Sequence, residues 1–158
     1  MSPALAAFPR LLRTINPEYE YRFYDDDQAR EFISRHFSDP YVLAYDSIIH
    51  GAFKADFFRC CALYVHGGYW FDIDMRALGA IDDIIPAHAE FVAPVESQWG
   101  CPHSLFNAVI GCIPQSPVLK EAIDIIMSRV ASKATATPVL ELEGTDYFGP
   151  GVLGRALN

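Results

Sequence analysis

The sequence predicts an α/β fold in which helices flank a mixed sheet, built as a single domain over residues 1–158. Two observations lead to this prediction. Segments with apolar residues at helical spacing alternate along the chain with short segments rich in aromatic and β-branched residues, the pattern of layered α/β proteins. About half of the residues (51%) are apolar, and 158 residues suffice for a proper hydrophobic core.

The first third of the chain predicts one strand, one helix and one turn. Aromatic residues alternate with charged residues over 19–24, which is typical of a strand. The acidic run 25–27 ends this strand and caps a helix over about 28–37, and Asp39-Pro40 marks a turn. The apolar face of that helix is expected to consist of Ala29, Phe32 and Ile33.

A longer helix is predicted over about 48–65, followed by a strand over 69–75. Gly67-Gly68 supplies the helix stop, where a left-handed backbone is needed. Alternation along the strand places Trp70, Asp72 and Asp74 on one face. The apolar stripe of the helix, at spacings of 4, 3, 1 and 3, comprises Phe53, Phe57, Cys60, Cys61 and Tyr64.

The second half predicts two more strands and two helices. The strands are expected over 90–96 and 107–113. Ser116-Pro117 opens a helix with a cap and a first-turn proline. A loop at 135–138 and a glycine-rich turn at 144–151 precede a short final helix. The buried stripe of the first of these helices is expected to be Leu119, Ala122, Ile123, Ile126 and Val130.

Composition excludes some partners and locations. A formal net charge of −8 argues against nucleic acid, because phosphates require a basic surface. No apolar run approaches the roughly 18 residues of a membrane span, so we expect no transmembrane segment in this chain. A cytoplasmic location is the default, and the Golgi lumen stays open for a chain whose anchor has been removed.

The four cysteines contain no CxxC pair. Cys60 and Cys61 lie in a helical apolar pattern, where neighbouring cysteines rarely bridge each other. We therefore expect all four to be reduced small hydrophobes, with a disulfide between Cys101 and Cys112 as the alternative.

Asp56 and Arg59 form the first candidate pair. Residues three apart share a face of a helix, and this face borders the apolar stripe. The pair is therefore expected at the edge of the core. A surface salt bridge worth a few tenths of a kcal/mol is the alternative without function.

Asp72 and Asp74 form the second candidate pair. Aspartate is disfavoured in strands, and these two follow three aromatic residues directly. On one strand face their Cα atoms would lie about 7 Å apart, and a divalent cation would remove their repulsion. Oxygen ligands favour Mg²⁺ or Mn²⁺ over zinc. A strand that ends in solvent, with acids at its exit, remains the alternative.

Other catalytic signatures are missing from the sequence. The five histidines show no H-x-x-x-H spacing, and no P-loop or G-x-S-x-G elbow is present. His66, beside the glycines, is expected to satisfy the carbonyls at the end of its helix. The Asp56–Arg59 pair and the Asp72–Asp74 pair are therefore the candidates for a functional site.

Together these motifs resemble a known family. The run Ala55-Asp56-x-x-Arg59, then Gly67-Gly68 after seven intervening residues, then Tyr69-Trp70-Phe71-Asp72-Ile73-Asp74, resembles glycosyltransferases with a DXD sugar-binding region. That group includes fungal initiating mannosyltransferases, bacterial capsular and lipopolysaccharide sugar transferases and, more distantly, clostridial glucosylating toxins. The likeness runs from about Thr14 to Leu157 and is densest from Ala52 to Met75. It extends to Asn16-Pro17-Glu18-Tyr19-Glu20-Tyr21, Phe106-Asn107-Ala108-Val109-Ile110, Ser116-Pro117-Val118-Leu119 and Gly149-Pro150-Gly151.

The resemblance implies a Rossmann-like GT-A fold and a metal-dependent transferase. Sugar would move, with retention of configuration, from a nucleotide-diphosphate sugar donor to a glycan or other hydroxyl acceptor. It implies that Asp74 ligates Mn²⁺ or Mg²⁺ and that Asp72 holds the ion through water or contacts donor hydroxyls. Donor contacts would come from Asp56, Arg59, Trp70 and Asn107, and Arg59 would act with both acids in catalysis. Alternation alone also leaves Trp70 open as a core residue.

The chain departs from the family's pattern at both ends. Met1 to Arg13 contains nothing like the family's first strand, which reads roughly Pro-Lys-Ile-Ile-His-x-x-Trp and helps to bind the base. Members usually continue past the Gly-Pro loop, where Phe148 stands in place of the typical threonine. We therefore expect a domain without the first strand and the C-terminal part, and base recognition and a third metal ligand stay unassigned.

Two other functions compete with this interpretation. A haloacid-dehalogenase-type phosphotransferase also carries Asp-x-Asp after an apolar strand, but Arg76 stands at its Thr/Val position. A truncated or inactive transferase fold could instead bind sugar without turnover. Binding of a nucleotide sugar without hydrolysis or transfer would favour this second function.

Overall fold

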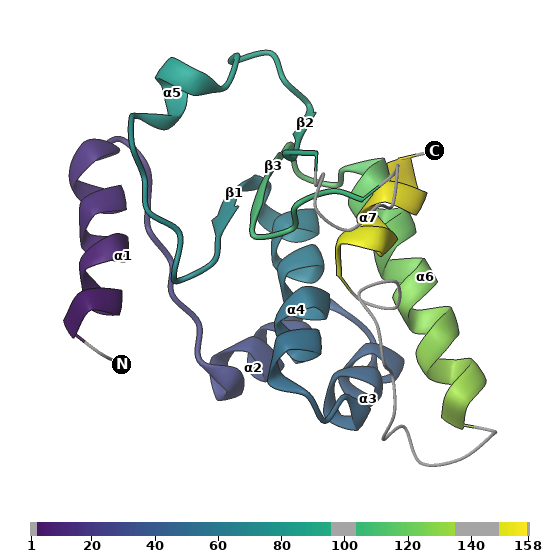
Figure 1. The fold of residues 1–158 in the computed structure, drawn as a ribbon. Helices are drawn as coiled ribbons and strands as arrows, with labels where there is room; N and C mark the ends of the chain where they lie inside the picture. Colours follow the sequence, from purple (N-terminus) through teal and green to yellow (C-terminus); the bar gives the residue numbers. More distant parts are fainter. Residues whose placement is uncertain (1–2, 96–103, 135–148, 158) are drawn as a thin grey trace.

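The computed structural model describes residues 3–95, 104–134 and 149–157 and shows helices around a small sheet (Figure 1). The helices in the first half are α1 (Pro3–Ile15), α2 (Asp26–His36), α3 (Asp39–Ser47) and α4 (Gly51–His66). They are followed by β1 (Gly68–Phe71), α5 (Ile81–Ile84), β2 (Phe91–Val92), β3 (Val109–Cys112), α6 (Pro117–Ala134) and α7 (Pro150–Leu157). The predicted α/β class is confirmed.

The described strands form one sheet in the order β1-β3-β2. Both strand pairs are antiparallel, where the sequence predicted a mixed sheet. In the central pair Trp70 lies opposite Ile110, and Phe71 lies opposite Val109. The two strands predicted over 90–96 and 107–113 are therefore present but shorter, and this register brings the end of β1 beside the segment that precedes β3.

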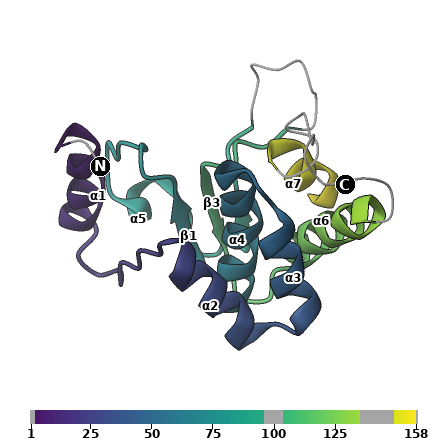
Figure 2. The same cartoon turned by 90° about the horizontal axis from the view of Figure 1, so that it is seen from below.

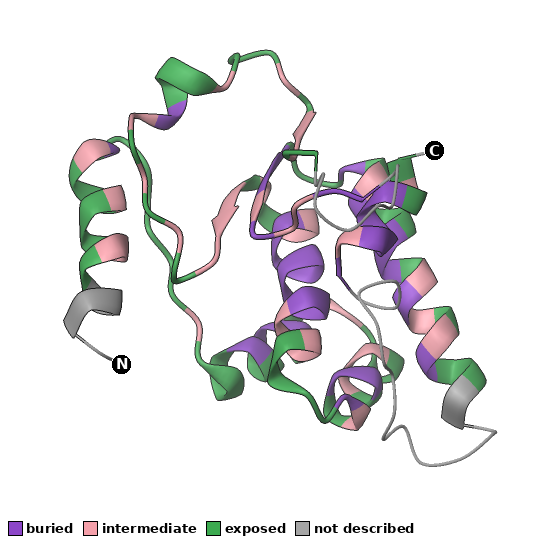
Figure 3. Ribbon diagram, in the orientation of Figure 1, coloured by how far each residue is buried: buried purple, intermediate pink, exposed green. Residues whose placement is uncertain are grey.

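Helix α4 runs through the centre of the molecule (Figure 1). Its residues 56–63 are all buried, so the helix has no solvent-facing side over two turns. It packs against α2, α3, α6 and the sheet. The fully buried members of this core, drawn in purple in Figure 3, include Ile33, Phe57, Cys61, Ile110, Leu119, Ile123 and Ile126.

The helix stop predicted at the double glycine is confirmed. Gly67 caps α4 with a φ of 64°, and its N–H donates to the carbonyl of Leu63 at 2.7 Å. A Cβ at this position would lie 2.6 Å from Pro114 Cδ, so only glycine fits both the backbone angle and the space. The chain can thereby turn from a buried helix directly into β1.

Several other predicted elements are confirmed. Asp25 caps α2 in a capping box with Gln28. The predicted apolar faces of α2 and α6 are buried, and a short helix, α7, occupies residues 150–157. Cys60, Cys61 and Cys112 are free thiols, whereas Cys101, the loop predicted at 135–138 and residues 144–148 lie outside the described residues.

Three predicted elements are wrong. Residues 19–24 form no strand, because this segment has no neighbouring strand among the described residues. Asp39-Pro40 begins α3 and is not a turn, since proline at the first helical positions loses no backbone bond. The strand predicted over 69–75 ends at Phe71, and a turn follows in which the N–H of Met75 donates to the carbonyl of Asp72.

The first helix was not predicted, and it lies apart from the core. Figure 2 shows α1 and α5 together on one side of β1, with the helices that form the core on the other. Asn16, at the end of α1, is buried and accepts a hydrogen bond from the N–H of Ile81 at 2.7 Å. None of the helices in the described part of the chain is long and apolar enough to cross a membrane.

Candidate functional site

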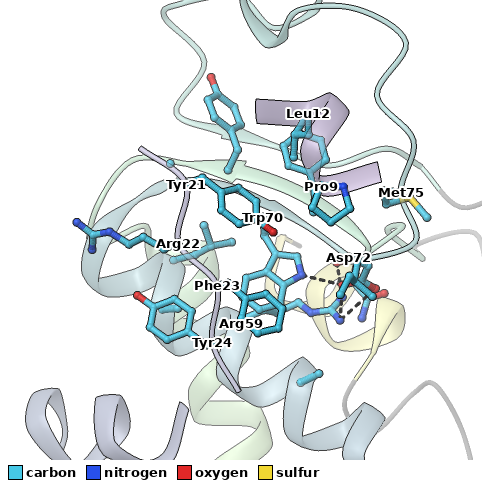
Figure 4. Close-up of a pocket in the computed structure, with 18 of the residues that line it drawn as sticks. Pro9, Leu12, Tyr21, Arg22, Phe23, Tyr24, Arg59, Trp70, Asp72 and Met75 are labelled. Carbon is cyan, nitrogen blue, oxygen red and sulfur yellow. Dashed lines mark hydrogen bonds and ion pairs between the residues drawn. The ribbon is translucent and has the colours of Figure 1, made fainter. Parts of the chain in front are cut away.

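A cavity of about 1090 Å³ separates the core from the N-terminal segment. Its inner wall consists of α4, β1, the acidic turn 72–75 and Asn107. Its outer wall consists of α1 and residues 16–24. Figure 4 shows Arg59, Trp70 and Asp72 on the inner wall, with Pro9 and Leu12 of α1 facing the same space. All the site residues predicted from the sequence line this one cavity.

Asp56 and Arg59 are buried on the inner wall. The Arg59 Nη2 atom lies 3.3 Å from Asp56 Oδ1, and the two side chains are 5% and 11% exposed. The helical spacing correctly placed both on one face, but the pair lies inside the core and not at its edge. An ion pair withdrawn from water in this way is retained only when further hydrogen bonds satisfy it.

Asn107 supplies these further bonds. Its Nδ2 donates to Asp56 Oδ1 at 2.7 Å, and its backbone carbonyl accepts a hydrogen bond from Arg59 Nη1. The residue reaches the pair because β3 runs antiparallel to β1 and brings the segment before it over α4. Asn107 was predicted from family likeness alone, and no local pattern in the sequence indicates its partners.

Asp72 is held from two sides. Arg59 Nη2 lies 3.0 Å from Oδ1 and 3.3 Å from Oδ2 of Asp72, while the Trp70 indole Nε1 donates to Oδ1 at 2.7 Å. Trp70 and Asp72 thus share a face as alternation predicted, and Trp70 is only half-buried and lines the cavity. The negative charge of Asp72 is compensated from inside the protein by Arg59.

Asp74 is placed differently from the prediction. It lies in the turn after β1, is exposed, and makes no side-chain hydrogen bond or ion pair to any described residue. The expectation that both acids project from one strand face and repel each other is therefore wrong, because the strand ends before Asp72. Asp74 offers an uncommitted carboxylate at the rim of the cavity.

Burial alters the acidity of Asp56. Loss of solvent raises the pKa of Asp56 to about 6, with the nearby Asp72 contributing, while Arg59 and Asn107 oppose the shift. Arg59 lies between two carboxylates and carries one positive charge, so the three side chains together hold one excess negative charge when both acids are ionised. A buried carboxyl with a pKa close to neutrality is typical of functional sites.

The outer wall contains residues that the sequence analysis did not assign to a site. Tyr21 and Phe23 line the cavity and stay 36% and 55% exposed. Arg22 lies with Nη1 2.8 Å from Nε2 of His66, the last residue of α4. Burial, and after it this cation, lower the pKa of His66. A signal for α1 did exist, since Leu5, Phe8, Leu12 and Ile15 stand at spacings of 3, 4 and 3.

Of the two acidic side chains in the turn after β1, one is available to bind a hard divalent ion and the other is already hydrogen-bonded. Asp74 presents carboxylate oxygens, which Mg²⁺ and Mn²⁺ prefer, but the oxygens of Asp72 are already bound by Arg59 and Trp70. Within residues 3–95, 104–134 and 149–157, no group of three His, Cys, Asp or Glu side chains could hold a metal. The arrangement therefore fits an ion held by one protein carboxylate, with water and substrate oxygens as its remaining ligands.

The sequence can be compared with known proteins on this basis. The profile of the family described as "Glycosyltransferase sugar-binding region containing DXD motif" matches residues 7–91, more than half of the chain. The chain belongs to this family. The matched region contains the Asp56–Arg59 pair and the Asp72–Asp74 pair, so the resemblance seen in the sequence is confirmed.

Relatives and a solved structure agree with the family. An uncharacterised glycosyltransferase of Acanthamoeba polyphaga mimivirus is 32% identical over 85% of this chain and 51% of its own length. Inositol phosphoceramide mannosyltransferase 3 of Schizosaccharomyces pombe is 29% identical over 69% of this chain and 29% of its own length. The chain therefore spans about half or less of these relatives. The structure of PaToxG Glycosyltransferase is similar in fold, with a TM-score of 0.72 at 15% identity over 99% of this chain and 64% of that one.

Proposed function

We propose that this protein is a metal-dependent, retaining glycosyltransferase that moves a sugar from a nucleotide-diphosphate sugar to a hydroxyl of a glycan or other acceptor. One observation carries the proposal: buried Asp56 and Arg59 form a network with half-buried Asn107 and Asp72 that faces the cavity, beside the uncommitted carboxylate of Asp74. Family membership supports the reaction class.

The residues of the inner wall divide into two roles in this proposal. Asp56 uses Oδ1 for both Asn107 and Arg59, and its Oδ2 makes no hydrogen bond to a described residue. This oxygen belongs to a side chain that is 11% exposed and lines the cavity, so it can accept a hydrogen bond from a sugar hydroxyl. Arg59 keeps Asp56 and Asp72 at fixed positions, so the donor sugar meets groups that need not reorganise.

Asp74 takes the second role, at the diphosphate end of the donor. Breaking the bond between the anomeric carbon and the diphosphate oxygen builds negative charge on the leaving group. Asp74 would hold a divalent ion, and Asp72 would steady it through water. When bound, the ion supplies Lewis-acid stabilisation of that charge. No side chain of the inner wall needs to remove the acceptor proton if the leaving phosphate accepts it.

The names of the relatives suggest which donors to test first. Two relatives in Schizosaccharomyces pombe are named as inositol phosphoceramide mannosyltransferases and one as an initiation-specific alpha-1,6-mannosyltransferase. Hexose donors, with nucleotide-linked mannose first, are therefore the proposed substrate class for this chain.

The proposal is tested with a panel of nucleotide sugars and Mn²⁺, scored for donor hydrolysis. We expect hydrolysis of at least one hexose donor and its loss in excess chelator. Full hydrolysis in excess chelator would contradict metal dependence. Calorimetric binding of a donor without hydrolysis, and without transfer to any acceptor, would contradict the enzyme and favour the sugar-binding module.

A further inference from the structure

The orientation of Trp70 is fixed before any ligand arrives. It is the third residue of β1 and lies opposite Ile110 of β3, so the ladder sets the direction of its side chain. Its ring packs edge-on against Phe58 of α4, with ring centroids 6.0 Å apart. Because Phe58 is buried in the core, the indole is supported by the rigid part of the molecule.

The polar edge and the face of this ring contact different residues. The indole Nε1–H donates to Asp72 Oδ1 at 2.7 Å, and the guanidinium carbon of Arg59 lies 5.5 Å from the ring centroid (Figure 4). The same guanidinium reaches Asp72. The indole therefore fixes the carboxylate of Asp72 by one oxygen and at the same time holds its counter-ion in place.

Among the described residues, the indole N–H is the one uncharged donor to the carboxylate of Asp72. The side chain of Asp72 is 31% exposed and follows the last residue of β1, where the ladder no longer restrains it. Its backbone N–H still donates to the carbonyl of Ala108, but that bond leaves the carboxylate free to rotate. An uncharged donor from a rigid ring restricts this rotation and preserves the negative charge.

We propose that Trp70 is a positioning residue, which acts through its indole N–H to hold the Asp72 carboxylate in the orientation that the metal–diphosphate end of the site requires. This role differs from a wall of the donor pocket, because it depends on one N–H group and not on ring area. It rests on the proposed function, since Asp72 needs a fixed orientation only if it serves that site.

The test compares Trp70→Phe, which keeps a flat ring but removes the N–H, with Phe58→Leu, which weakens the packing of the ring but keeps the N–H. We expect Trp70→Phe to weaken Mn²⁺ binding, measured by calorimetry, and to lower kcat for donor hydrolysis, each by about 10-fold. Phe58→Leu should lower Tm and change both quantities several-fold less, because the pairing of β1 with β3 still directs the indole. Equal Mn²⁺ affinity and kcat in Trp70→Phe and wild type would overturn the inference while leaving the proposed function intact.

A spectroscopic measurement tests the contact even if the protein turns over no donor. The sequence has two tryptophans, Trp70 and Trp99, so Trp70→Phe assigns the indole N–H resonances in a nitrogen–proton correlation spectrum. We expect the Trp70 resonance to lie downfield and to move upfield in Asp72→Ala. A resonance that does not move in Asp72→Ala would overturn the inference, whereas absence of hydrolysis with a moving resonance would count against the proposed function alone.

Discussion

The two walls of the cavity are held in different ways. On the inner wall, Arg59 is 5% exposed and contacts two carboxylates and a backbone carbonyl. On the outer wall, Arg22 is 43% exposed and pairs with Glu20, two residues away, and with His66. The polar contacts of the inner wall are therefore buried in the hydrophobic core. Those of the outer wall are accessible to water.

This difference predicts unequal costs for removing the two arginines. Arg59→Ala leaves Asp56 buried without its cation, so we expect the free energy of unfolding to fall by about 3–5 kcal/mol. Arg22→Ala is the matched change on the outer wall. It should lower the free energy of unfolding several-fold less, because water screens the ion pair of Arg22 with Glu20. Urea denaturation of both variants measures the contrast, and equal losses of stability would contradict it.

Within the inner wall, a substitution of Asp74 should affect activity without affecting stability. Because it is exposed and has no described partner, Asp74→Asn should leave the unfolding midpoint unchanged. The proposed metal role is worth several kcal/mol in the transition state, so metal-dependent donor hydrolysis should fall by at least about 100-fold. Asp83→Asn is the matched control, an exposed aspartate in α5 that does not line the cavity. Full activity in Asp74→Asn would exclude this role.

Asp56 should make stability depend on pH in an unusual direction. Its pKa is raised from 3.8 to about 6 by burial, so the folded state binds the proton more tightly than the unfolded chain. The resulting stabilisation is fully present below about pH 4 and is lost as the pH rises through about 6, a change of about 3 kcal/mol.

Denaturant unfolding at pH 5 and pH 7, for wild type and Asp56→Asn, isolates this contribution. Groups that titrate in both proteins cancel in the difference between their free energies of unfolding. Wild type should gain stability relative to Asp56→Asn as the pH is lowered from 7 to 5. A difference that stays constant with pH would show that Asp56 has an ordinary pKa.

The sequence predicted the inner wall well, for physical reasons. Burial leaves a periodic trace, so the stripe that includes Phe57 and Cys61 defined α4, and i,i+3 spacing placed Asp56 beside Arg59. Alternation placed Trp70 and Asp72 together. The end of β1 could not be predicted in this way, because it depends on where its partner β3 begins, and Val109, the first residue of β3, pairs with Phe71.

The outer wall was predicted poorly because local patterns do not determine its structure. Residues 19–24 alternate like a strand, but a strand needs a neighbour, and none of the described residues provides one. The pairing of Tyr19 with Asp82, which lie 63 residues apart, likewise leaves no local trace. Metal ligation and donor specificity remain predictions for the same reason, since they depend on groups that no spacing specifies.

The smallest expected effect concerns the attachment of the outer wall. Asn16 donates from Nδ2 to the carbonyl of Leu12 and accepts at Oδ1 from the N–H of Ile81, which links the end of α1 to the start of α5. Asn16→Ala leaves these buried groups without partners, so we expect a loss of about 1–2 kcal/mol. Thr14→Ala is the control, because its hydrogen bond to the carbonyl of Arg10 is exposed.

Hydrogen exchange shows where the loss of Asn16 acts. If Asn16 attaches the outer wall independently of the core, Asn16→Ala should speed exchange of the amides of α1 and α5 and leave α4 unchanged. Faster exchange in α4 as well would mean that the outer wall unfolds together with the core. The contrast between the walls would then lie in their exposure to water alone, and cavity-lining residues such as Tyr21 would be as firmly placed as Arg59.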